Sequence, residues 1–113
     1  MTVENLVEEL SMQVLTGKDQ LKRDISSAYC CDLLSRVMAN GSKDGVWITI
    51  QTHLNTVAVA TLLDLSCIVI PEDIPVDEKT LVKAEEEQVV ILSSPMTAYT
   101  ISGKLYSFGI LGE

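Results

Sequence analysis

Polar side chains that could bind a ligand stand at the points where predicted strands end. The carboxyl ends of parallel strands meet at one edge of a sheet, and α/β domains bind small molecules there. Helix amino termini at that edge offer free N–H groups, which suit a phosphate or a carboxylate. The candidate ligand-binding residues are Asp32, Gln51, Thr52, His53, Asn55, Ser93 and Ser94.

His53 is the single histidine of the chain, and the sequence leaves several roles open for it. Because an unperturbed histidine side chain changes charge near physiological pH, such a residue could bind an anion or act as a general acid or base with Asp32. In a structural alternative, Thr52 or Asn55 caps the following helix and His53 lies partly exposed. Asp32 also has a structural alternative, as the N-cap of the helix after it.

The other reactive side chains have structural explanations. Cys30 and Cys31 precede a predicted helix, where a thiolate is favoured, but alternation along a strand would bury one of them. Ser93-Ser94 is more typical of a turn than of a nucleophile, because no Gly-x-Ser-x-Gly elbow surrounds it. Cys67 is expected in the core, and Trp47 in the core or at an interface.

Several functional motifs are missing from the sequence. It has no Gly-x-x-x-x-Gly-Lys-Ser/Thr phosphate loop, no Gly-x-Gly-x-x-Gly, no His-Glu-x-x-His and no Cys-x-x-Cys. The chain is therefore not a P-loop kinase by itself, and no metal or cofactor is expected. Three cysteines do not form a disulfide framework, which favours the reducing cytoplasm.

The composition predicts one folded domain spanning residues 1–113. Hydrophobic residues make up 47% of the chain, and its net charge is −8. Acidity of this size disfavours binding to nucleic acid or to anionic membranes, which requires clustered Lys and Arg. No apolar run approaches the ~18 residues of a membrane span, and the first residues lack the basic region of a signal peptide.

Alternating strands and helices would position the candidate residues. Strands are expected at 12–15, 25–29, 45–50, 66–70 and 89–92, and helices after Thr2, after Asp32, from 54, after Asp77 and from about 96. This alternation predicts an α/β domain with a mainly parallel sheet and helices on both faces. The helix from residue 54 is expected to bury an apolar stripe made of Leu54, Val57, Ala58, Thr61, Leu62 and Leu65.

Three stretches resemble the DRTGG domain family, particularly its small stand-alone members of bacterial type. They are residues 27–40 (SAYCCDLLSRVMAN), 47–60 (WITIQTHLNTVAVA) and 84–92 (AEEEQVVIL). The resemblance implies a three-layer α/β/α domain similar to the amino-terminal domain of HPr kinase/phosphorylase. It also implies a regulatory, dimer-forming module of the kind found beside CBS domains in pyrophosphatases. The Asp-Arg-Thr-Gly-Gly segment that names the family would fall at residues 51–55, where this chain has QTHLN.

Three functional hypotheses follow from the sequence. The first is a non-catalytic regulatory domain, a homodimer that binds a small anionic metabolite or nucleotide at the carboxyl edge of the sheet. The second is a module for protein interaction or dimerisation that binds no ligand. The third is a small acid/base enzyme that uses His53.

Overall fold

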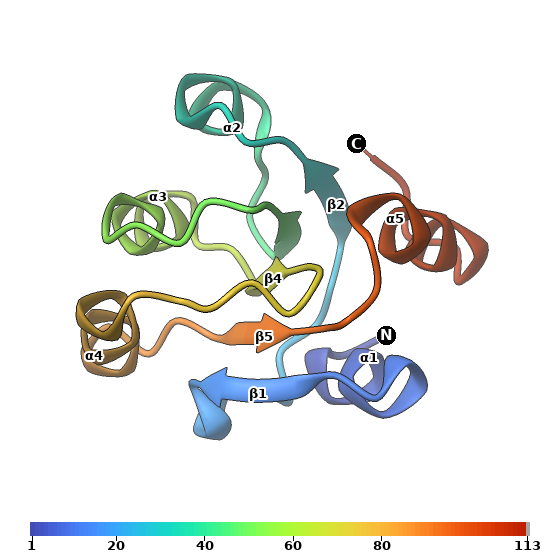
Figure 1. The fold of residues 1–113 in the computed structure, drawn as a ribbon. Coiled ribbons are helices and arrows are strands. Elements are labelled where there is room, and N and C mark those ends of the chain that lie inside the picture. Colours follow the sequence, from blue (N-terminus) through green and yellow to red (C-terminus); the bar gives the residue numbers. More distant parts are fainter. Residues whose placement is uncertain (113) are drawn as a thin grey trace.

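Five short strands form one mixed sheet in the computed structural model, which describes residues 1–112. The spatial order of the strands is β1-β5-β4-β3-β2. β2, β3, β4 and β5 run parallel, and β1 pairs antiparallel with β5 at one edge (Figure 1). The strands are β1 (Gln13–Thr16), β2 (Ser27–Cys30), β3 (Gly45–Ile48), β4 (Cys67–Ile70) and β5 (Ile91–Ser93).

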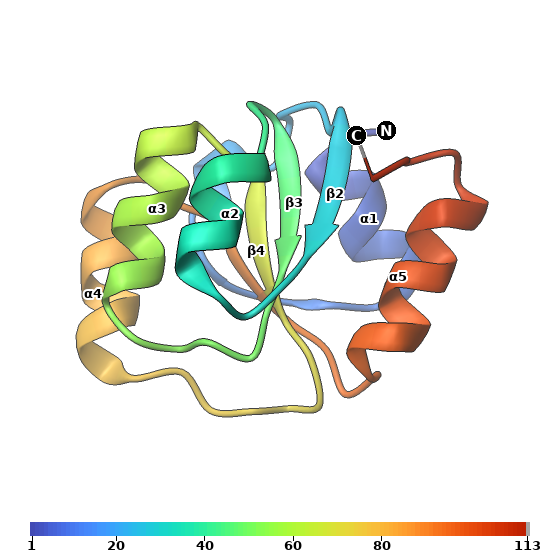
Figure 2. The same ribbon diagram turned by 90° about the horizontal axis from the view of Figure 1, so that it is seen from above.

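Helices cover both faces of the sheet and give the domain three layers. One face carries α1 and α5, and the other carries α2, α3 and α4 (Figures 1 and 2). The helices are α1 (Val3–Leu10), α2 (Leu34–Asn40), α3 (Asn55–Leu63), α4 (Glu78–Glu86) and α5 (Ala98–Ser107), and a 3-10 turn, η1, spans Lys18–Gln20.

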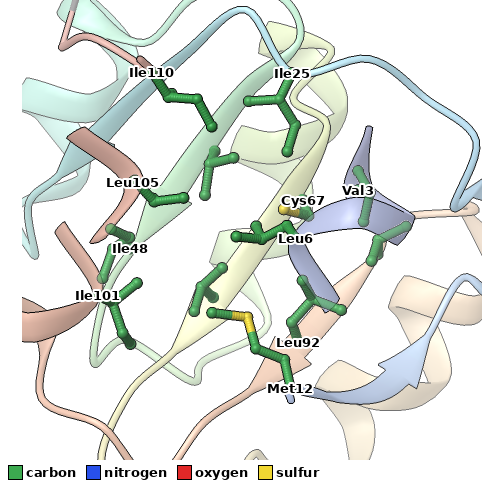
Figure 3. Close-up of a cluster of buried hydrophobic side chains, with 13 residues drawn as sticks. Val3, Leu6, Met12, Ile25, Ile48, Cys67, Leu92, Ile101, Leu105 and Ile110 are labelled. Carbon is green, nitrogen blue, oxygen red and sulfur yellow. The ribbon is translucent and has the colours of Figure 1, made fainter. Parts of the chain in front are cut away.

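Each face of the sheet has its own apolar core. Leu6 of α1 and Leu105 of α5 pack with Ile48 and Cys67 on one side (Figure 3). Trp47, Ile68 and the buried residues of α2, α3 and α4 pack on the other. Neighbouring residues of β3 and β4 point to opposite faces, so continuous apolar runs supply both cores.

The predicted architecture is confirmed by the structure. The sheet is mainly parallel, and every predicted strand and helix lies within a few residues of its expected position. Thr2 caps α1 as expected: its hydroxyl accepts a hydrogen bond from the Asn5 amide, and the Asn5 side chain accepts one from the Thr2 amide. Thr97 caps α5 by accepting from the Thr100 amide.

Some predicted details are wrong. Asp32 is not an N-cap, because α2 begins after Leu33 and has no side-chain cap. Leu33 and Met38, beside or in the second predicted helix, and Phe108, at the end of the last one, are apolar but exposed.

The buried face of α3 also differs from the prediction. Thr56, Val57, Val59 and Ala60 face the sheet, whereas Leu54 and Leu62 are exposed. Because α3 is apolar on all sides, its periodicity did not determine which face would be buried.

Two glycines offer a matched test of local backbone energetics. Gly103 lies inside α5, and a Cβ added there meets nothing within 4 Å. We therefore expect Gly103→Ala to stabilise the protein by about 0.5–1 kcal/mol, the difference in helix propensity. Gly17→Ala should have the opposite sign, because Gly17 has a φ of +75° and its added Cβ would lie 2.9 Å from Val90 Cα.

Urea denaturation of both glycine variants checks this pair. A destabilised Gly103→Ala variant, or a Gly17→Ala variant as stable as the natural chain, would contradict the structure at these positions.

Candidate functional site

The loops that follow the parallel strands run together at one edge of the sheet, at the bottom of Figure 2. Asp32 follows β2, and its Oδ1 accepts hydrogen bonds from the Thr49 hydroxyl at 2.8 Å and from the Ile50 amide at 2.9 Å. The Gln51 side chain donates to the Asp32 carbonyl at 3.0 Å. These contacts join the loop after β2 to the loop after β3, so the structure brings Asp32 and Gln51 together.

Thr49 organises this junction and was not predicted as a site residue. Its side chain is buried, and its hydroxyl both donates to Asp32 and accepts from the Gln51 amide at 3.1 Å. In the sequence, Thr49 lies within a run of β-branched and apolar residues. A strand alone therefore accounted for a threonine at this position, and no polar role was predicted. Only the placement of the neighbouring strand shows that its hydroxyl has a polar partner.

Thr52, His53 and Asn55 form the turn that enters α3. Neither Thr52 nor Asn55 caps the helix; instead His53 Nδ1 accepts from the Asn55 amide at 3.3 Å. This bond leaves Nε2 as the protonated nitrogen of a neutral ring, and the ring is exposed. The Thr80 hydroxyl donates to the Thr52 carbonyl at 2.8 Å, which ties the turn to α4.

Three successive amides in this turn have no acceptor. Within residues 1–112, no hydrogen bond engages the N–H groups of Thr52, His53 or Leu54. Successive unpaired N–H groups in a turn can converge on an anion. The turn therefore has the donors that an anionic ligand requires.

Ser93 and Ser94 lie away from this cluster. Ser93 is the last residue of β5 and Ser94 follows it. β4 and β3 separate β5 from β2, so the distance across the sheet to Asp32 is about 14 Å. Ser94 is fully buried, and its hydroxyl accepts from the Met96 amide at 3.1 Å. Its backbone also binds the loop after β4, as acceptor from the Asp73 amide and donor to the Ile70 carbonyl. The contacts of Ser94 are those of a turn.

Trp47 and Cys31 lie next to the Asp32 loop. Trp47 is 1% exposed, which makes it a core residue and not an interface anchor. Its indole N–H donates to the Cys31 carbonyl at 2.8 Å. Cys30 is exposed and Cys31 is half-buried against the core, so alternation along the strand buries one of the pair only in part. Cys67 is buried, as expected.

The described residues show neither a metal cluster nor a membrane span. Over 1–112, no three His, Cys, Asp or Glu side chains are grouped so that they could hold a metal ion. None of the helices in that range is long and apolar enough to cross a membrane.

Removing the Asp32 carboxylate should loosen the junction of the two loops. Asp32→Ala leaves the buried Thr49 hydroxyl and the Ile50 amide without their acceptor, and we expect a loss of about 1–2 kcal/mol in unfolding free energy. Amide exchange of Ile50 should accelerate in the same variant. Asp32→Asn keeps an Oδ1 acceptor and should lose less. Equal stability of Asp32→Ala and the natural chain would show that these bonds contribute nothing.

Comparisons with known proteins place the fold. No family model matches the sequence. The chain is 25% identical, over 130 aligned positions, to an HPr kinase/phosphorylase of Streptococcus uberis; the match covers 99% of this chain and 42% of that protein. The chain thus spans less than half the length of the curated relative that it matches.

A solved structure has the same fold. It is that of the CBS and DRTGG domains of the regulatory region of Clostridium perfringens pyrophosphatase, complexed with the activator diadenosine tetraphosphate. The TM-score is 0.73 at 12% sequence identity, over 90% of this chain and 44% of that chain. Together with the relative in Streptococcus uberis, this likeness confirms the DRTGG-like architecture that the sequence predicted.

Proposed function

With a DRTGG-like fold as the premise, we propose that this chain is a non-catalytic regulatory domain that senses a small anionic metabolite or a nucleotide. The observation that carries the proposal is the run of unpaired amides at Thr52, His53 and Leu54. The three free cysteines support a cytoplasmic setting. We further propose that the domain acts as a homodimer.

The charge of the chain limits how an anion could be recognised. A net charge of −8 repels anions at long range, so recognition must rest on donors fixed at the site. The three amides and the exposed His53 ring provide such donors. The acidic residue in the loop next to this turn is Asp32. Its Oδ1 already accepts hydrogen bonds from two donors.

The hydrogen bonds of the turn provide a route for a signal. Gln51 connects the turn to the loop after β2, and Thr80 connects it to α4. A ligand that orders this turn would bias both neighbours, provided it binds one arrangement more tightly than the other.

A thermal-shift screen of the purified chain tests the proposal. The probes are diadenosine tetraphosphate, adenine and guanine nucleotides, dinucleotides, sugar phosphates and acetyl phosphate. The activator in the pyrophosphatase structure guides the choice of the first probe. A true ligand at a concentration ~100 times its Kd should stabilise the fold by about 2.7 kcal/mol.

Two variants separate this site from others on the surface. The double variant His53→Ala, Asn55→Ala should lose the response, whereas Lys104→Ala, on α5 and on the opposite face of the sheet, should keep it. A response that survives the double variant would place the ligand elsewhere.

The two other hypotheses make different predictions. A flat panel with a well-folded protein would favour the module for protein interaction or dimerisation without a ligand, for which the exposed apolar residues of α3 argue. Turnover that disappears in His53→Gln would favour the acid/base enzyme. No hydrogen bond or ion pair joins His53 to Asp32 within residues 1–112.

A further inference from the structure

Helix α3 is apolar on the side that faces away from the sheet. Leu54, just before the helix, is 40% exposed and Leu62 is 68% exposed, and Ala58 and Thr61 are exposed as well. α3 contains no charged residue, in a chain with 16 acidic and 8 basic side chains. A helix that is apolar on all sides is normally covered on all sides, so this face lacks a partner.

Two adjoining hollows extend this apolar face toward α4, which lies beside α3 in Figure 2. The first has a volume of about 590 Å³ and is lined mainly by α3. The second, of about 300 Å³, lies along α4, and Leu54 and Lys83 line both. We call the combined surface the α3–α4 groove and define it by Leu54, Ala58, Thr61, Leu62 and Val82.

The α4 side of the groove carries both signs of charge. Lys79, Val82, Lys83 and Glu86 follow the spacing i, i+3, i+4, i+7, so they share one helix face. Lys83 forms an ion pair with Glu87 at 3.2 Å. Its distance to Glu86 is longer, 3.8 Å. Among the described residues Lys79 has no ion-pair partner, and the Glu86 side chain is 62% exposed. One cation and one anion on this face are therefore available to a second molecule.

We propose that the α3–α4 groove is covered by the same groove of a second copy of this chain. In a two-fold contact the same patch meets itself, so its charges must be complementary to themselves. A two-fold axis that is perpendicular to α4 and passes between Val82 and Lys83 makes the two α4 helices run antiparallel. Lys79 and Glu86 are equidistant from that axis, so Lys79 of each copy faces Glu86 of the other.

The charge of the groove favours this occupant over a strongly charged partner. The charged residues lining the two hollows are Glu78, Lys79, Lys83, Glu86 and Glu87, with two positive and three negative charges. This near balance contrasts with the net charge of −8 for the whole chain. Interface cores are depleted in charge and rimmed by polar groups, as this groove is.

Sedimentation equilibrium over micromolar to millimolar concentrations tests the inference, which rests on the proposed homodimer. Leu62→Glu should raise the dimer dissociation constant about tenfold or more, because it places a charge in the apolar contact. Tyr106→Glu is the matched control: Tyr106 is also 68% exposed but lies on α5, on the other face of the sheet.

A charge exchange tests the antiparallel pairing itself. Lys79→Glu and Glu86→Lys should each weaken the dimer. Each variant places two like charges opposite one another at both of the symmetry-related contacts between positions 79 and 86. The double variant should restore much of the lost affinity, whereas Lys104→Glu, which changes the charge equally on α5, should have no effect. Far-UV circular dichroism verifies that each variant is folded.

The outcomes distinguish the two proposals. A natural chain that is monomeric throughout would overturn both the homodimer and this interface. If the natural chain dimerises and Leu62→Glu does not weaken the dimer, the homodimer proposal stands and the α3–α4 groove is not its interface. A dimer weakened by Leu62→Glu but not restored in the charge-exchange double variant would overturn the antiparallel pairing.

Discussion

Replacing Trp47 by alanine should cost about 3–5 kcal/mol of unfolding free energy, a large part of the stability of a domain of this size. The side chain is 1% exposed and packs in the core beneath α2, α3 and α4. Its removal opens a cavity that the neighbouring side chains can fill only in part. It also deprives the Cys31 carbonyl of the indole N–H.

Trp47→Phe separates these two contributions. It keeps most of the packing and loses the hydrogen bond, so we expect a smaller loss of about 1–3 kcal/mol. Both variants should be followed by circular dichroism in urea, because each removes the only tryptophan of the chain. A Trp47→Ala variant within 1 kcal/mol of the natural chain would show that the core collapses around the site at little cost.

Alkaline pH should destabilise the fold through Cys67. Burial raises the pKa of the Cys67 thiol from 9.0 to about 12, against a smaller opposing effect of the Arg23 charge. The sign follows from the unfolded chain, which loses this proton near pH 9 while the folded protein still holds it. Stability is therefore fully present below pH 9 and falls between pH 9 and about 12, by about 1.4 kcal/mol per pH unit.

The variant Cys67→Ala isolates this effect from the other groups that titrate at high pH. We expect its stability to fall less steeply above pH 9 than that of the natural chain, measured by urea denaturation under reducing conditions. All other titrating groups are common to both proteins and cancel in the difference. Parallel curves would show that water reaches the thiol, which Figure 3 places within an apolar cluster.

The hydrogen bond between Trp47 and the Asp32 loop makes the Trp47 indole a spectroscopic reporter of the candidate site. The indole N–H binds the carbonyl of Cys31, the residue before Asp32. A ligand that moves this loop should change the environment of the indole. Trp47 fluorescence can thus follow the nucleotide titrations proposed above.

Short-range signals predicted much of the fold. The apolar run 66–70 has the length and composition of a buried strand, and it forms β4 in the middle of the sheet. Thr2 was recognisable as a helix start, because a hydroxyl just before a helix can accept from an amide within the next few residues.

The candidate site was predictable in its position but not in its contacts. Asp32 and Gln51 lie 19 residues apart in sequence and meet only because β2 and β3 are parallel neighbours. Ser93 and Ser94 end a strand at the same edge, yet the spatial order of the strands sets them on the far side of β4. Strand order is a long-range property that local composition does not contain.

The alternation of apolar runs with amphipathic segments was sufficient to predict an α/β domain, because helices that cross over between parallel strands bury their apolar sides on both faces of the sheet. Which face of α3 meets the sheet depended on long-range packing, because a helix with apolar residues on all sides gains from burial in any orientation. The tertiary structure also decided the role of Asp32, whose carboxylate could satisfy a helix end or a neighbouring loop. Thr49 and Ile50, in the loop directly after β3, donate to that carboxylate in the folded chain.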